Sequence, residues 1–155
     1  MSIDTQGTRL IREYRQTLGG TPEQVFPLLC PEREKDWLPG WDARWIHSDT
    51  GLAEPNAVFA TRNDDGPETI WVVAGHVPSS RVHFVRWHPG VMVVHIELGL
   101  TSPQPGSTWL DIRYMYTATS SPGRAQIQAM TPAQWHAQMK NWEDHLNAWL
   151  AAHPA

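Results

Sequence analysis

A chain of 155 residues supplies one domain with a sizeable core, whereas a division into two domains would leave both cores thin. Its 41% hydrophobic and 18% charged residues are typical of a folded globular protein and exclude a largely disordered chain. The net charge is −4 with histidine neutral, and the Arg and Lys residues are scattered, so we expect no nucleic-acid partner.

The chain is expected to open with a strand over residues 8–18, which the following two glycines end. A helix should come next, because Thr21 can cap it, Pro22 suits its first position and Gln24 can close a capping box. Pro27 cannot donate to the helical hydrogen-bond ladder, so this helix is expected to be short or kinked.

A second short helix is expected from Cys30-Pro31 to about Leu38, and it holds the longest charged run of the chain, residues 32–36. The signs of the charges alternate along the run, which is typical of a solvated helix face. The segment 37–41, Trp-Leu-Pro-Gly-Trp, places two tryptophans around a chain break. Such a pair suits the mouth of a pocket, and it also suits the anchoring of small helices to a sheet edge.

The middle of the chain is expected to form six strands separated by turn-rich segments. The expected strands are residues 44–47, 57–61, 69–75, 81–87, 91–100 and 108–117. The intervening segments are too short for parallel crossovers, so neighbouring strands should be antiparallel and joined by hairpins.

The last expected strand and the C-terminal segment both have one apolar face. Alternate residues of the strand form its dry face: Leu110, Ile112, Tyr114 and Tyr116. The segment after Thr131 repeats the helix-start pattern, and its large apolar residues recur at steps of four and three: Trp135, Met139, Trp142, Leu146 and Trp149. The simplest arrangement that buries both faces is a sheet curved around a long C-terminal helix.

This order of elements, with three particular segments, resembles the START-like superfamily. The segments are FPLLCPEREKDWLPGW at 26–41, TIWVV at 69–73, and the stretch 130–150. They are similar to the polyketide-cyclase and lipid-transport branch (the SRPBCC group), in a bacterial subgroup to which no reaction is attached. The resemblance implies one α+β helix-grip domain over residues 1–155, with about seven antiparallel strands wrapped around the long helix and two short helices after the first strand. It also implies an apolar pocket, and it assigns no catalytic residue.

Cellular location can be inferred only from what the sequence lacks. No apolar run approaches the ~20 residues that cross a bilayer, so we expect no membrane span. The first residues lack the basic and apolar pattern of a signal peptide. Cys30 is the single cysteine, so no internal disulfide can form. Together these features predict a cytoplasmic protein.

Eight histidines raise the question of a metal site, but none of them shows the spacing of a ligand pair on a helix. A two-residue turn at Pro89-Gly90 would pair His83 with Ile96, whereas a three-residue turn can bring His83 opposite His95. The sequence does not choose between these turns. We predict no metal site and no cofactor.

Acid–base chemistry would require an ionisable side chain that faces the cavity. Arg86, His95 and Glu97 can share one face of neighbouring strands, which we interpret as the solvated outer face. That interpretation rests on the dry alternation of the next strand: Met92, Val94, Ile96, Leu98 and Leu100. Tyr114 and Tyr116 are better placed to orient a ligand, although core filling also explains them.

Nine tryptophans in so short a chain favour a wide cavity with aromatic walls. The residues expected to bind the ligand are Trp37, Trp41, Trp71, Tyr114, Tyr116, Trp135, Met139 and Trp142. The first hypothesis is therefore binding of a small hydrophobic or aromatic molecule. The alternatives are an enzyme of the cyclase or dehydratase kind, and a protein-interaction module similar to chaperone-binding START-like domains. The sequence leaves the ligand, catalysis and homodimer formation open, although exposed tryptophans or a free sheet edge could mediate a dimer.

Overall fold

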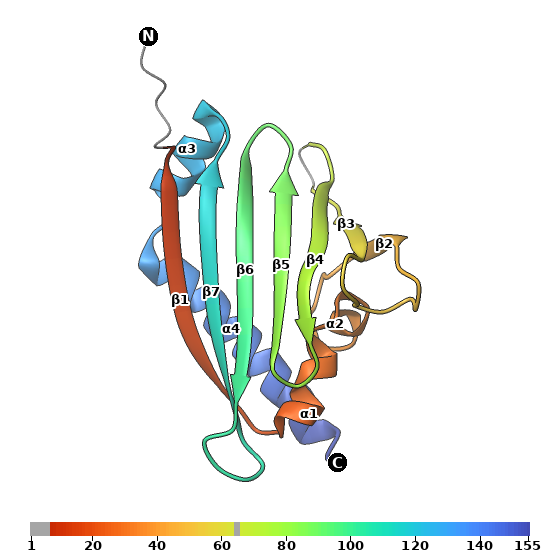
Figure 1. Ribbon diagram of the computed structural model, residues 1–155. Coiled ribbons are helices and arrows are strands. Elements are labelled where there is room, and N and C mark those ends of the chain that lie inside the picture. Colours follow the sequence, from red (N-terminus) through yellow and green to blue (C-terminus); the bar gives the residue numbers. More distant parts are fainter. Residues whose placement is uncertain (1–6, 64–65) are drawn as a thin grey trace.

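The computed structural model describes residues 7–63 and 66–155, and in these residues seven strands form one antiparallel sheet (Figure 1). The strands are Arg9–Leu18 (β1), Ala43–His47 (β2), Val58–Thr61 (β3), Thr69–Val77 (β4), Arg81–His88 (β5), Met92–Thr101 (β6) and Thr108–Ala118 (β7). Their order in the sheet is β1-β7-β6-β5-β4-β3-β2, so the first strand joins the last one and the others follow as a meander.

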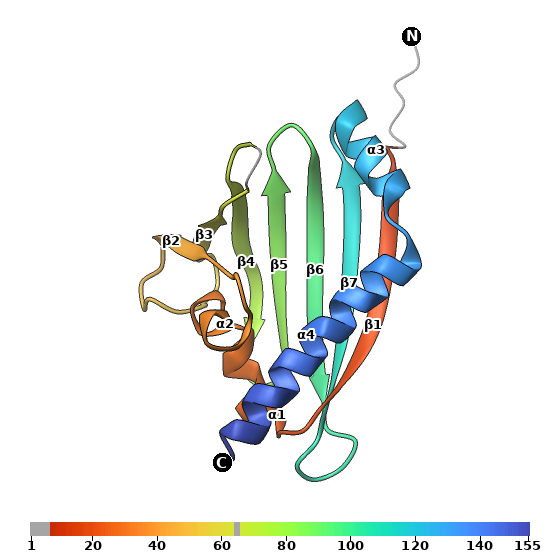
Figure 2. The ribbon, with the colours of Figure 1, turned by 180° about the vertical axis from the view of Figure 1, so that it is seen from behind.

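The helices lie on one side of the sheet, and the longest one crosses its face (Figure 2). They are Pro22–Val25 (α1), the 3-10 turn Phe26–Leu29 (η1), Pro31–Trp37 (α2), Ser121–Ala129 (α3) and Pro132–Ala152 (α4). This arrangement confirms the predicted curved sheet, the two short helices and the long C-terminal helix. Among the described residues, no helix combines the length and the apolar character needed to span a bilayer.

The predicted helix starts are present. Thr21 and Thr131 each accept a hydrogen bond from the backbone of the glutamine three residues later, and that glutamine's side chain accepts from the cap backbone. The helix that begins at Pro22 continues as a 3-10 turn around Pro27, which explains why it is short. Helix α3 was not predicted, because its sequence SPGRAQIQA offers little apolar periodicity beyond Ile127.

The C-terminal helix is tied to the first strand by side-chain hydrogen bonds. Glu143 is buried on the face of α4 that meets the sheet, where its carboxylate accepts from the Tyr14 hydroxyl (3.1 Å) and the Thr17 amide (2.6 Å). The Gln16 side chain donates to the backbone oxygen of Met139 (3.0 Å). These contacts fix how α4 lies across β1, and α4 with the sheet encloses the interior.

The register of the β5–β6 hairpin differs from both sequence alternatives. His88 pairs with Met92, so three residues, 89–91, connect the two strands. The three-residue turn considered from the sequence, His88-Pro89-Gly90, begins one residue earlier. His83 therefore lies opposite Glu97, and it still reaches His95 on the diagonal, with 3.3 Å between its Nε2 and the His95 Nδ1.

This register corrects the prediction for Arg86. The sequence analysis placed Arg86 on the outer face with His95 and Glu97, and this was wrong for Arg86. It pairs with Val94, whose side chain is fully buried, so Arg86 points to the inner face of the sheet. The prediction was correct for the other two residues, since His95 pairs with Val85 and Glu97 with His83 on the outer face.

Candidate functional site

An internal cavity of about 230 Å³ lies between the inner face of the sheet and α4, on the side of α2. Side chains of α2 and the turn after it, of strands β3 to β7, and of α4 form its wall. The lining residues are Glu34, Leu38, Trp41, Phe59, Trp71, Phe84, Arg86, Ile96, Leu98, Tyr114, Gln138, Met139, Asn141 and Trp142. Of these, Gln138 and Asn141 are exposed to solvent and mark the opening.

Aromatic rings packed against one another form the apolar wall. Phe59 stacks on Trp71 with 5.2 Å between the ring centroids and 18° between the planes, and Phe84 meets both rings edge-on. The Trp41 ring lies edge-on to the Trp71 ring, with 5.8 Å between the ring centroids. Two indole N–H groups of the wall have hydrogen-bond acceptors in the protein: Trp41 donates to the Pro31 oxygen (2.8 Å) and Trp71 to the Thr61 hydroxyl (3.0 Å). The ring carbons are therefore the surface that a ligand would meet.

Five of the eight residues expected to bind a ligand line this cavity. They are Trp41, Trp71, Tyr114, Met139 and Trp142. The structure does not place the other three on the wall. Trp37, the last residue of α2, is buried, and its indole donates to the Leu28 oxygen (2.8 Å). Trp135 and Tyr116 are buried and bonded to each other, with 2.9 Å between indole nitrogen and hydroxyl.

Glu34 is an acidic wall residue that the sequence analysis missed. It is only 5% exposed, and among the described residues it makes no ion pair. Burial raises the pKa of Glu34 well above its usual range, because the charged form loses its hydration without gaining a cation. The run 32–36 was interpreted as solvated, which was wrong for this position. The signal lay in its spacing, three residues from each of the buried Pro31 and Trp37.

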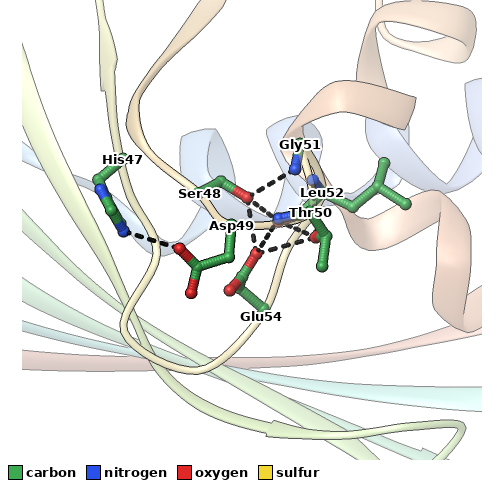
Figure 3. A network of polar contacts seen from close by, with 7 residues as sticks. All are labelled: His47, Ser48, Asp49, Thr50, Gly51, Leu52 and Glu54. Atoms are coloured by element: carbon green, nitrogen blue, oxygen red, sulfur yellow. Dashed lines mark hydrogen bonds and ion pairs between the residues drawn. The ribbon is translucent and has the colours of Figure 1, made fainter.

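A second carboxylate shows the opposite behaviour in an exposed loop. Glu54 lies between β2 and β3, where it accepts hydrogen bonds from the Thr50 amide, the Thr50 hydroxyl and the Ser48 hydroxyl, each at 2.8 Å (Figure 3). These bonds, that from the Thr50 amide first, lower the pKa of Glu54. All three bonds reach the same carboxylate oxygen, Oε1, from donors of the same loop, so the network stabilises a turn.

Arg86 brings a permanent positive charge to the cavity wall. Its guanidinium carbon lies 5.2 Å from the centre of the Trp71 ring and 5.7 Å from that of Tyr114, within the range of cation–π attraction. Burial raises the pKa of Tyr114, and the charge of Arg86 opposes this rise. Burial and then Arg86 lower the pKa of the neighbouring His88 to about 4, which keeps that imidazole neutral.

A carboxylic acid, a guanidinium and a phenol thus share one enclosed apolar space. Such a set can orient a polar group of a ligand, and it can also supply a proton donor next to a fixed positive charge. No group of three metal-ligating side chains occurs within residues 7–63 and 66–155. The His83–His95 pair lies on the opposite face of the sheet, where His83 lines an open hollow together with Glu97 and Arg113.

The comparisons with known proteins agree with this architecture. No family model matches the sequence, and no curated protein matches it either. Among solved structures, norcoclaurine synthase from Thalictrum flavum, in complex with dopamine and hydroxybenzaldehyde, is 10% identical over 96% of this chain and 90% of its own, with a TM-score of 0.69. The Mll3558 protein from Rhizobium loti is 14% identical over 92% and 98%, with a TM-score of 0.64. CalU16 from Micromonospora echinospora is 15% identical over 96% and 86%, with a TM-score of 0.61. Such a likeness establishes a common fold, and it confirms the helix-grip fold that the START-like resemblance implied.

Proposed function

We propose that the protein binds a small molecule with an aromatic or apolar body in the internal cavity. The observation that carries this proposal is a partly open pocket of about 230 Å³ with stacked aromatic rings in its wall and polar side chains placed among them. A concave pocket with a mainly apolar wall and a small number of placed polar groups is the usual form of a small-molecule site. The norcoclaurine synthase structure, which has the same fold, was solved with two single-ring aromatic compounds.

The size of the cavity limits the ligand. Binding sites for drug-sized molecules usually measure roughly 300–1,000 Å³, and this one is smaller. A molecule with one or two rings fits it better than a long lipid or a multi-ring polyketide. The exposed Gln138 and Asn141 on α4 form the opening through which the ligand would enter.

Native mass spectrometry of the purified protein, with extraction of whatever co-purifies, is the first test. Titration with 2-naphthol, a neutral two-ring probe, followed by calorimetry is the second. We expect Gln138→Trp to weaken 2-naphthol binding at least ten-fold, because an indole at the opening would block it. Gln128→Trp, an equally exposed position on α3, is the matched control and should bind like the wild type. No co-purified compound together with no heat of binding in the wild type would refute the proposal.

One observation favours an enzyme of the cyclase or dehydratase kind as a second candidate. That function requires an ionisable side chain in the cavity, and Glu34 and Tyr114 are both on its wall. A tetraketide thioester is a suitable probe, because aldol condensation of its C2 carbon onto its C7 ketone would close a six-membered ring with loss of one water. We expect the wild type to form the cyclised product faster than the spontaneous reaction and Glu34→Gln to give no acceleration while it still binds 2-naphthol. Equal product formation with and without the wild type would leave only the binding function.

A further inference from the structure

Two fully buried side-chain nitrogens of the cavity wall have no hydrogen-bond partner in the described part of the chain, and both are donors. Among the described residues, four buried side-chain nitrogens have no hydrogen-bond partner, and two of them belong to wall residues, Arg86 Nε and Trp142 Nε1. A guanidinium and an indole carry N–H groups that donate and cannot accept. A buried donor without an acceptor is costly, so a ligand that offers acceptors to these two groups gains affinity.

The wall also carries a positive charge, that of Arg86, which no carboxylate of the described residues pairs with. None of the ion pairs within the described residues involves Arg86 or Glu34. Burial favours the neutral form of Glu34, and a neutral carboxyl adds one more donor without compensating the charge of Arg86. Arg86 therefore places a positive charge on the cavity wall without an ion-pair partner among residues 7–63 and 66–155.

The aromatic contacts of Arg86 leave room for such a counterion. Trp71 and Tyr114 lie near the guanidinium at 5.2 and 5.7 Å, and a cation–π contact uses the face of the ring. It does not supply the acceptors that the N–H edge of the guanidinium requires. That edge matches a carboxylate, which accepts two parallel hydrogen bonds from it.

We propose that the ligand is an aromatic acid of one or two rings, whose carboxylate pairs with Arg86 while its ring lies against Phe59 and Trp71. This inference rests on the proposed function, because it names the ligand class of the same cavity. The indole N–H of Trp142 and the carboxyl of Glu34 are the further donors on the wall that the carboxylate can meet.

Two nearly isosteric probes test the charge directly. We expect the wild type to bind 2-naphthoate at least ten-fold more tightly than 2-naphthamide in calorimetric titrations at pH 7. Arg86→Gln should remove this preference by weakening the acid and leaving the amide within about two-fold. Arg113→Gln is the matched control, because Arg113 is paired with Glu13 and Glu97 on the outer face, and its preference for the acid should equal that of the wild type.

The wild-type comparison stands even if Arg86→Gln does not fold, and Arg86→Lys then serves as the second variant. It keeps the charge but lacks the planar pair of donors, so the preference for the acid should shrink without disappearing. Equal affinity of the wild type for acid and amide overturns the inference while the binding function stands. Unchanged discrimination in Arg86→Gln overturns the role of Arg86. Absence of binding for both probes and for 2-naphthol refutes the binding function itself.

Discussion

Glu34 makes the stability of this fold depend on pH in an unusual direction. An ordinary carboxylate in a folded protein gains partners, and the fold loses stability as the pH falls. Glu34 is buried without a cation, and its pKa in the folded state is raised above the ordinary value of about 4.3 that it has in the unfolded chain. Its contribution to stability is therefore greatest below that unfolded value, and it is lost as the pH rises through the folded pKa.

The substitution Glu34→Gln should remove this dependence. Between the unfolded and folded pKa values of Glu34, we expect the wild type to lose about 1.4 kcal/mol of unfolding free energy per pH unit relative to the variant. Urea unfolding at several pH values from 4 to 8 measures the difference. Glu23→Gln changes an exposed carboxyl of α1 and should run parallel to the wild type. A constant difference between wild type and Glu34→Gln across this range would contradict the burial argument.

The sequence predicted aromatic and apolar residues of the cavity wall, but it did not predict the two charged ones. Trp41, Trp71, Tyr114, Met139 and Trp142 were expected at the cavity from their types and spacing, and they line it. The two charged wall residues were not expected there. A charged residue in a polar run looks solvated unless its spacing to buried neighbours is weighed, as for Glu34. The side on which Arg86 lies depends on a hairpin register that the sequence left open.

At the scale of elements, the strength of each local signal decided what could be predicted. The capping boxes at Thr21 and Thr131 and the turn-rich breaks between strands are local, so the sequence located two helix starts and the strands. Helix α3 lacks an apolar stripe, and the register of β5 against β6 depends on which residues the turn takes up. The formation of α3 and the β5–β6 register both depend on contacts with residues distant in the sequence, and such contacts are hard to infer from a single sequence.

The cap of α4 offers a test at this scale. Thr131 is exposed and accepts the backbone N–H of Gln134 at 3.2 Å, at the start of the helix that covers the cavity. Thr131→Ala should lower the unfolding free energy by about 1 kcal/mol, because the N–H group loses its acceptor. Thr131→Ser keeps the hydroxyl and should stay within about 0.5 kcal/mol of the wild type. Chemical denaturation of the three proteins checks this, and equal losses in both variants would show that the hydroxyl does not matter.

For the whole molecule, the two faces of the sheet suggest different roles. The inner face encloses the cavity, which argues against an interaction module with a filled core. The outer face carries apolar side chains open to solvent, among them Trp87 (48% exposed) and Ile11 (41% exposed). The sequence leaves homodimer formation open, and the outer face is where its contacts would be sought. The cytoplasmic location likewise stays a prediction.

The pairing of β1 with β7, and the bonds from β1 to α4, have a consequence for synthesis on the ribosome. The first strand is made before every other element of the fold, yet its partner strand β7 and its covering helix α4 follow all the other strands in the sequence. Until then its backbone groups are unpaired, and the long separation in sequence slows their closure. The sheet and its covering helix cannot be completed until α4 has left the ribosome, so a chain stalled before residue 130 should need a holding chaperone to stay out of aggregates.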